Sequence, residues 1–221
     1  MDTRIDNTAA DLQRLYRGVL GGDGTIEPGG LTVAFERDFG SFAQWQAAFA
    51  AMAQTPGWTA LAWSPAQGRL VHQRAADDGV PLLAFEPRLH GGSVDDFIRQ
   101  IRWAVVNDAY AAAVERTTAE LGMTAQAARA SAMQIVDVRR AAAFDQAGEQ
   151  LPGAVWRDPT QIAAWADALD RRQPVLVYCV YGHEVGRSTA LALRLRGVDA
   201  HFLVGGVADW QRDGHPMEVK S

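Results

Sequence analysis

Hydrophobic positions in the first half of the chain recur mostly at helical spacing. In four segments the apolar residues return every three or four positions, which predicts amphipathic helices. Ser41 and Ser93 stand at the start of two of these segments, where their hydroxyls suit N-caps. The predicted helices cover residues 8–20, 31–40, 41–55 and 93–116.

Between the third and the fourth of these helices the pattern changes to short apolar runs. Residues 57–65, 68–75 and 80–87 have the composition of strands, and turn-forming residues separate them. We expect them to form a three-stranded antiparallel meander. Helices combined with such a sheet predict an α+β unit.

In the second half, strand-like runs alternate with helical patterns. Strands are expected at 133–140, 174–180 and 200–206, and helices at 158–172, 186–197 and 207–214. Asp158 is the expected N-cap of the first of these helices. The alternation predicts an α/β unit with a parallel sheet and helices on both faces. The boundary lies near residues 117–131, so we predict domains at 1–117 and 118–221.

Composition limits the partners. The 221 residues carry a formal net charge of −5, which argues against a nucleic acid or a membrane as partner, because both need a basic surface. No apolar run has the length of a membrane-spanning helix, and the first residues lack the apolar core of a signal peptide. A single cysteine excludes an internal disulfide, so we expect a cytoplasmic protein.

That cysteine, Cys179, stands where an apolar strand meets a loop and then a helix. Ligands of open α/β sheets bind at the carboxyl ends of the strands. The N–H groups of residues 180–184 and the positive end of the helix dipole would stabilise an anion there. We therefore expect a lowered thiol pKa and a role as nucleophile or as carrier of a persulfide. A buried structural cysteine is an equally good interpretation of the local pattern.

Three segments of residues 131–221 follow one another in a recognisable order: "IVDVRRAAAFDQAGEQLPGAVW", "VLVYCVYGHEVGRSTALAL" and "AHFLVGGVADWQRDGHPM". In their order and spacing they resemble a rhodanese-type sulfurtransferase domain. The resemblance implies that Cys179 is the catalytic nucleophile that forms a persulfide. The residues expected to bind substrate are Val180, Tyr181, Gly182, His183, Glu184 and Arg187.

The length of the cysteine loop separates sulfur chemistry from phosphate chemistry. Related cysteine phosphatases carry Cys-x5-Arg, whose arginine binds phosphate oxygens. Here Val185 occupies the arginine position, and Arg187 follows two residues later. Glu184 would repel phosphate, and it would also disfavour the thiosulfate dianion relative to a persulfide donor. His183 is either a proton donor to a leaving thiol or a solvated loop residue.

Four further residues of this half are expected to be structural. Asp137 and Arg139 stand together at a strand end, where we expect a hydrogen-bonded pair and no catalytic role. Gly205 and Gly206 are expected to allow a close approach of the backbone to the cysteine loop.

Residues 18–116 resemble the C-terminal domain of iron/manganese superoxide dismutases, through "ERDFGSFAQWQAAFAAMA", "GWTALAW", "VPLLAFEPRLH" and "IRWAVVNDAYAAAV". That resemblance implies a three-stranded antiparallel sheet with helices. The metal site of the family needs three histidines and one aspartate. Glu86 and His90 match two of the ligands, but no histidine precedes His72. We therefore expect this half to hold no metal.

The leading hypothesis is a cytoplasmic sulfurtransferase that needs no cofactor. It would take sulfane sulfur from a small-molecule or protein persulfide and pass it to a thiol or cyanide. The first half would form a homodimer or bind a partner. The alternatives are a non-catalytic redox sensor or scaffold, and a superoxide dismutase that takes missing ligands from another chain.

Overall fold

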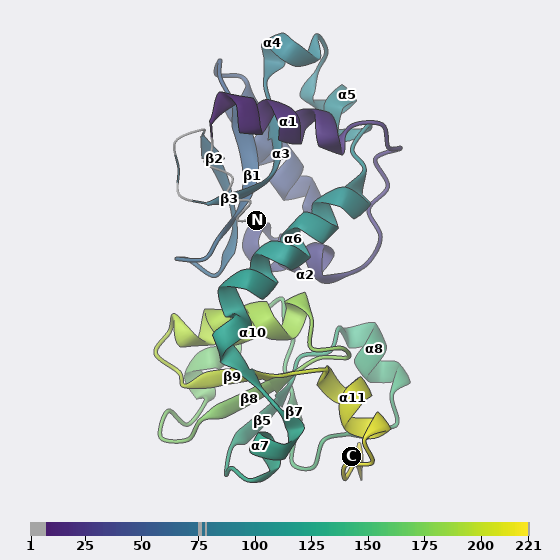
Figure 1. The fold of residues 1–221 in the computed structure, drawn as a ribbon, viewed down its shortest axis with the longest axis vertical. Coiled ribbons are helices and arrows are strands. Elements are labelled where there is room, and N and C mark those ends of the chain that lie inside the picture. Colours follow the sequence, from purple (N-terminus) through teal and green to yellow (C-terminus); the bar gives the residue numbers. More distant parts are fainter. Residues whose placement is uncertain (1–7, 75–76, 78, 221) are drawn as a thin grey trace. The chain divides into compact units, whose positions relative to one another are not determined.

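The computed structural model describes residues 8–74, 77 and 79–220, and the chain divides into two compact units. The division falls between Ala113 and Val114, inside helix α6 (Trp103–Thr118), and the turn Ala66–Gly68 groups with the second unit. Each unit has its own main sheet (Figure 1). In the described part of the chain, no helix has the length and apolarity to cross a membrane.

The first unit is built on an antiparallel sheet in the order β2–β1–β3. Its strands are β1 (Thr59–Ser64), β2 (Arg69–Arg74) and β3 (Val80–Phe85). The antiparallel sheet is confirmed, but the predicted meander is wrong because β1, not β2, lies in the centre. Every residue of β1 is buried, whereas β2 is partly exposed, as expected for a central and an edge strand.

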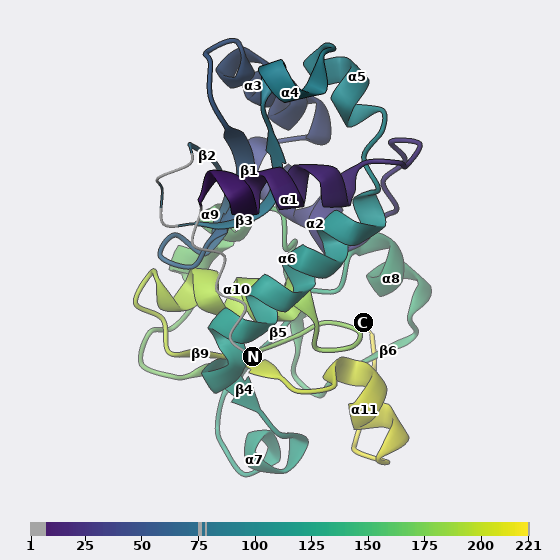
Figure 2. The ribbon, with the colours of Figure 1, turned by 45° about the horizontal axis from the view of Figure 1, so that its top comes forward.

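Helices of this unit occur at the sequence positions that the apolar spacing predicts. Ser41 caps the third predicted helix by accepting the N–H of Gln44, so this N-cap is confirmed. Figures 1 and 2 show α1 beside β3, and the two elements are in contact. The helices of this unit that precede α6 are α1 (Ala9–Val19), α2 (Gly30–Phe39), α3 (Phe42–Ala53), α4 (Pro87–His90) and α5 (Val94–Ile98).

The long helix predicted over residues 93–116 is two helices, α5 and α6. Ser93 does cap the first of them, through the N–H of Asp96. The helix then breaks because the backbone pairs with the end of α1: Ile101 bridges Leu20, and the N–H of Arg102 donates to the carbonyl of Val19 at 2.7 Å. This pairing joins residues far apart in the sequence, so local periodicity does not reveal it.

The second unit contains a five-stranded parallel sheet in the order β4–β9–β8–β5–β7. The central strand, β8 (Val175–Tyr178), is fully buried. The edge strand β4 (Gly122–Met123) comes from the segment in which we placed the boundary. The remaining strands of this sheet are β5 (Gln134–Asp137), β7 (Val155–Trp156) and β9 (Ala200–Leu203). A separate antiparallel pair consists of β6 (Glu149–Gln150) and β10 (Glu218–Val219).

Helices cover both faces of this sheet, as predicted. Val175 and Val177 face one side, where the residues of α9 and α10 pack, and Leu176 and Tyr178 face the other side, with α7 and α11. The helices of this unit are α7 (Ala125–Arg129), α8 (Ala141–Gln146), α9 (Ile162–Trp165), α10 (Glu184–Arg194) and α11 (Gly206–Arg212), with the 3₁₀ turns η1 (Ala119–Leu121) and η2 (Ala166–Ala168).

The helix predicted over residues 158–172 is much shorter than expected. Only α9 and the turn η2 are helical in that segment. Asp158 is not its N-cap. Its carboxylate instead accepts the N–H and the hydroxyl of Thr160, both at 2.8 Å, which forms a local turn before the helix.

Candidate active site around Cys179

Cys179 directly follows β8, the central strand of the parallel sheet. A loop of four residues separates it from α10, whose N-cap is His183. The cysteine thus lies at the carboxyl end of a strand and beside the start of a helix, in the arrangement expected from the sequence.

Four backbone N–H groups form hydrogen bonds to the cysteine sulfur. Those of Tyr181, Gly182 and His183 belong to the loop in which we expected them. The fourth, from Gly186 in the first turn of α10, was missed. A Cβ atom at Gly186 would lie 3.3 Å from Sγ, so glycine lets the helix approach the sulfur closely. In the sequence, the glycine at the start of an otherwise ordinary helical pattern is the signal that could have indicated this role of Gly186.

Burial and these hydrogen bonds have opposite effects on the pKa of the Cys179 thiol. Cys179 is 7% exposed. Burial raises the pKa of its thiol above the ordinary value, and the four N–H groups only partly oppose this effect. The predicted lowering of the pKa is therefore wrong for the free cysteine. Burial therefore favours the neutral thiol over the thiolate more than in an ordinary cysteine.

Two glycines hold the loop in place. Gly182 and Gly206 have φ of 67° and 60°, in the left-handed region that favours glycine. A Cβ at Gly206 would lie 2.5 Å from the carbonyl oxygen of Cys179, and one at Gly182 would lie 2.6 Å from that of Leu203. The close backbone approach expected at Gly206 is confirmed.

The loop carbonyls bond to the start of α11. The N–H of Val207 donates to the carbonyl of Cys179 at 3.0 Å, and that of Ala208 donates to the carbonyl of Val180 at 2.9 Å. With these carbonyls fixed on one side, the N–H groups of the following loop residues can face the sulfur. Val180 therefore contributes a carbonyl that anchors the loop.

Arg187 also supports the loop. Its Nε donates to the carbonyl of Gly182 at 3.0 Å, its guanidinium lies 4.4 Å from the ring centroid of Phe202, and its Nη2 is 3.5 Å from Glu115. Its side chain is only 17% exposed. These contacts explain how Arg187 positions the loop, and a direct contact with substrate stays a prediction.

The rim of the site carries Tyr181, His183 and Glu184. Tyr181 is 61% exposed, and its ring lies 5.7 Å from that of His183, which is exposed as well. Glu184 is partly buried at the first position of α10. The expected roles of these three side chains in substrate binding stay predictions.

A buried polar network lies under the same end of the sheet. Nε of Arg139 donates to Asp137 at 2.8 Å, and the hydroxyl of Tyr178 donates to Asp137 at 2.7 Å. Burial and the neighbouring carboxylate raise the pKa of Tyr178, so its hydroxyl keeps its proton. Trp156 donates to the carbonyl of Arg139 at 2.9 Å. The predicted Asp137–Arg139 pair is confirmed as a structural support for β5 and β8.

Glu86 and His90, the two residues that matched metal ligands, have other partners. Glu86 caps α4 by accepting the N–H of Arg88 at 3.3 Å. Nδ1 of His90 lies 2.9 Å from the hydroxyl of Tyr16, and its ring packs edge-to-face against Phe97. Among the described residues, no three histidine, cysteine or acidic side chains gather where they could hold a metal. The residues present do not fit an iron or manganese site.

Two separate similarities connect the chain to known proteins. The family model of the Rhodanese-like domain matches residues 122–213. The thiosulfate sulfurtransferase GlpE of Actinobacillus succinogenes is 35% identical over 86 residues, which cover 38% of this chain and 75% of that protein. The N-terminal region matches an iron superoxide dismutase of Cupriavidus metallidurans, 37% identical over 123 residues. That match covers 47% of this chain and 62% of the dismutase, so the chain spans less than two thirds of that relative.

The chain is also similar to solved structures. A rhodanese-related protein of Thermoplasma volcanium is 20% identical with a TM-score of 0.39, and covers 45% of this chain and 98% of its own. A rhodanese-like domain protein of Staphylococcus aureus is 23% identical with a TM-score of 0.39, over 45% of this chain and 98% of its own.

Proposed function

The chain belongs to the rhodanese-like family, and on that premise we propose that it is a sulfurtransferase that carries sulfane sulfur as a persulfide on Cys179. The observation that carries this proposal is the set of four N–H donors around Sγ at the start of α10. Backbone N–H groups and a helix N-terminus stabilise an anion without a fixed counter-charge. That is the requirement of a site that holds a persulfide anion.

The proposed cycle has two displacements at sulfur. The Cys179 thiol loses its proton, and the thiolate attacks the sulfane sulfur of a donor persulfide, so that the donor's S–S bond breaks and its thiolate leaves. The new S–S bond leaves Cys179 as a persulfide. An acceptor thiolate or cyanide then attacks the outer sulfur, and the Cys179 thiolate leaves. Each step exchanges one bond to sulfur for another, so no outside oxidant or reductant is needed.

The raised pKa of Cys179 means that its proton must leave when the donor binds. His183 is exposed at the rim, where it can accept this proton or give one to the leaving donor thiolate. Proton transfer at the mouth of the site is therefore a separate requirement of the first step.

The rim also favours certain donors. Glu184 places a carboxylate beside the mouth of the loop, which disfavours the thiosulfate dianion and favours a persulfide of a thiol or of a protein. Tyr181, 61% exposed, and Val204, 48% exposed, offer apolar surface at the two loops that meet at Gly182. We propose a small-molecule or protein persulfide as donor and a thiol as acceptor, with the first unit acting as a dimerisation or partner-binding module.

A redox sensor is a weaker explanation of the same site. Sensor cysteines are accessible and have a lowered pKa, because oxidants react with the thiolate. Cys179 is buried and its pKa is raised. A carrier that rests as the neutral thiol, forms the thiolate only during the two displacements and holds its sulfur as a persulfide anion fits these two observations better.

Intact mass spectrometry tests the proposal. The purified chain is incubated with thiosulfate, glutathione persulfide or cysteine persulfide, and its mass is measured before and after addition of cyanide. We expect one added sulfur, lost to cyanide with formation of thiocyanate over many turnovers, and no added sulfur in Cys179→Ser. A chain that stays unloaded with all three donors, or that reacts only once, contradicts the proposal.

A further inference from the structure

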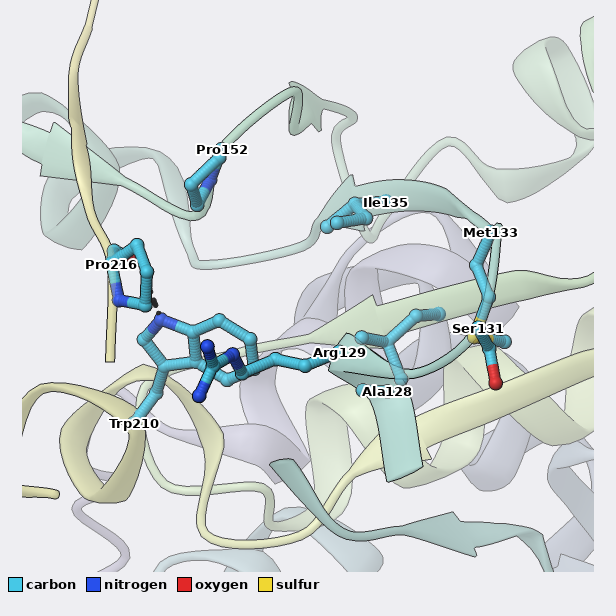
Figure 3. Close-up of a pocket in the computed structure, with 9 residues that line it drawn as sticks. Ala128, Arg129, Ser131, Met133, Ile135, Pro152, Trp210 and Pro216 are labelled. Carbon is cyan, nitrogen blue, oxygen red and sulfur yellow. Dashed lines mark hydrogen bonds between the residues drawn. The ribbon is translucent and has the colours of Figure 1, made fainter. Parts of the chain in front are cut away.

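A cavity lies on the second unit's sheet, on the face opposite to the one that carries Cys179. This face is covered by the short helices α7 and α11, of five and seven residues, which leave part of the apolar surface open. The cavity has a volume of about 220 Å³ (Figure 3). Its lining residues are Ala128, Arg129, Ser131, Met133, Ile135, Pro152, Leu176, Trp210 and Pro216.

The inner wall of the cavity is apolar and fixed in position. Leu176 of β8 and Trp210 of α11 are 1% and 5% exposed, and they belong to the core on this face of the sheet. Nε1 of Trp210 donates to the carbonyl of Pro216 at 2.8 Å, which fixes the orientation of the indole ring (Figure 3). A preformed wall of this kind suits a flat apolar group.

The mouth of the cavity is positively charged. Arg129 is the one charged residue among those that line the cavity, and its side chain extends across Trp210 in Figure 3. Within the described part of the chain, Arg129 forms no ion pair with a carboxylate. Its Nη1 lies 3.3 Å from Nδ1 of His215, which must accept because a guanidinium only donates. The neighbouring Asp213 already pairs with Arg212 at 3.1 Å.

We infer that this cavity binds a small amphipathic carboxylate. Its apolar body, an aromatic ring with a short chain, would lie against Trp210 and Leu176, and its carboxylate would accept hydrogen bonds from the guanidinium of Arg129. An apolar cavity of about 150 Å³ accommodates benzene, so a volume of about 220 Å³ suits a ring with two or three further carbons.

This site is separate from the proposed sulfur chemistry. Leu176 precedes Cys179 by three residues, about 10 Å along the strand, and the two side chains face opposite sides of the sheet. A ligand in the cavity and a sulfur donor at Cys179 therefore do not compete for space.

Three probes with the same apolar body test the inference on the full chain. They are 3-phenylpropionate, 3-phenylpropanol and 3-phenylpropylamine, which differ in the charge of the terminal group. Binding is followed by amide and indole N–H shifts in two-dimensional NMR. We expect the carboxylate to bind most tightly and the amine most weakly, with the largest shifts at Ala128, Ser131 and the indole of Trp210.

A matched pair of variants isolates the charge. Arg129 is exposed, so Arg129→Gln should fold normally, and it should weaken binding of 3-phenylpropionate by about fivefold or more while leaving that of the alcohol within about twofold. Arg172→Gln, at another exposed arginine, should leave the binding of both the acid and the alcohol unchanged. The inference is overturned if the alcohol binds as tightly as the acid, if Arg129→Gln has no selective effect, or if none of the probes shifts the lining residues at about 10 mM.

Discussion

His72, in β2 of the first unit, allows a quantitative prediction. Its ring lies 4.8 Å from that of Phe39 and 5.8 Å from that of Phe49. Its Nε2 is buried and has no hydrogen-bond partner among the residues that the structure describes. Protonation would place a charge in this aromatic environment. Burial, and to a smaller extent the positive charge of Arg69, therefore lower the pKa of His72 from 6.5 to about 4.

The lowered pKa makes the stability of the first unit depend on pH. The unfolded chain takes up a proton at His72 near pH 6.5, whereas the folded unit resists it until about pH 4. The contribution to stability is therefore complete above pH 6.5 and is lost as the pH falls toward 4. The difference between 6.5 and 4 corresponds to at most about 3 kcal/mol, and about 2 kcal/mol remains after allowing for the partial exposure of the side chain.

The test compares the chain with His72→Phe, which keeps an aromatic ring and removes the titration. Hydrogen exchange of the β1 amides at pH 7 and pH 4.5 reports the free energy of opening of the first unit alone. We expect the unaltered chain to lose about 2 kcal/mol more than His72→Phe between these two pH values. His183→Gln, at an exposed histidine of the second unit, should behave like the unaltered chain.

A direct NMR titration of the His72 ring completes the experiment. A midpoint near 6.5, or equal losses in the unaltered chain and in His72→Phe, would refute the reasoning, because either result means that water or an acceptor reaches Nε2.

Three further predictions concern the Cys179 loop. Glu184→Gln should raise the turnover of thiosulfate by several-fold to about tenfold, and less at high salt, because it removes about 1 kcal/mol of charge repulsion; an unchanged rate means that the carboxylate points away from the path of the donor. Because the pKa of the Cys179 thiol is raised, sulfur loading should increase about tenfold per pH unit between pH 6 and pH 8. If the rate of sulfur loading, measured in stopped assays, levels off below pH 7.5, that result would contradict the raised pKa. Gly206→Ala should lower the transfer rate by more than about tenfold, since its Cβ would lie 2.5 Å from the carbonyl of Cys179; full activity in a folded variant would show that the loop adapts.

Most elements were predictable from the sequence because their signals are local. Apolar spacing and the caps Ser41 and Ser93 define helices without reference to the rest of the chain. The errors lie where distant segments meet. The end of α1 interrupts the predicted helix at Ile101, and β1 lies in the centre of its sheet because it pairs with β2 on one side and with β3 on the other.

For the candidate site, too, local sequence signals predict one part, and contacts between distant segments decide the other. The place of Cys179 between strand and helix follows from the order of the segments, and so do three of the four N–H groups around it. The direction of the pKa change at the Cys179 thiol does not follow from the order of the segments, because it depends on burial that α10 and the start of α11 produce together. Gly186 and Gly206 permit that burial, and their roles become visible only when the distances to Cys179 are known.

The raised pKa and the ring of N–H donors are compatible within one catalytic cycle. A thiolate would place its charge on Sγ itself, at a buried position where the cost of desolvation exceeds the gain from the four hydrogen bonds. A persulfide places its charge on the outer sulfur, about 2 Å farther along the S–S bond. In the proposed cycle this moves the charge out of the buried base and toward the mouth of the loop, where the N–H groups and the helix N-terminus still act but less desolvation is required. On this proposal the same site would disfavour the free thiolate and favour the loaded state, which is the selectivity that a sulfur carrier needs between donor and acceptor.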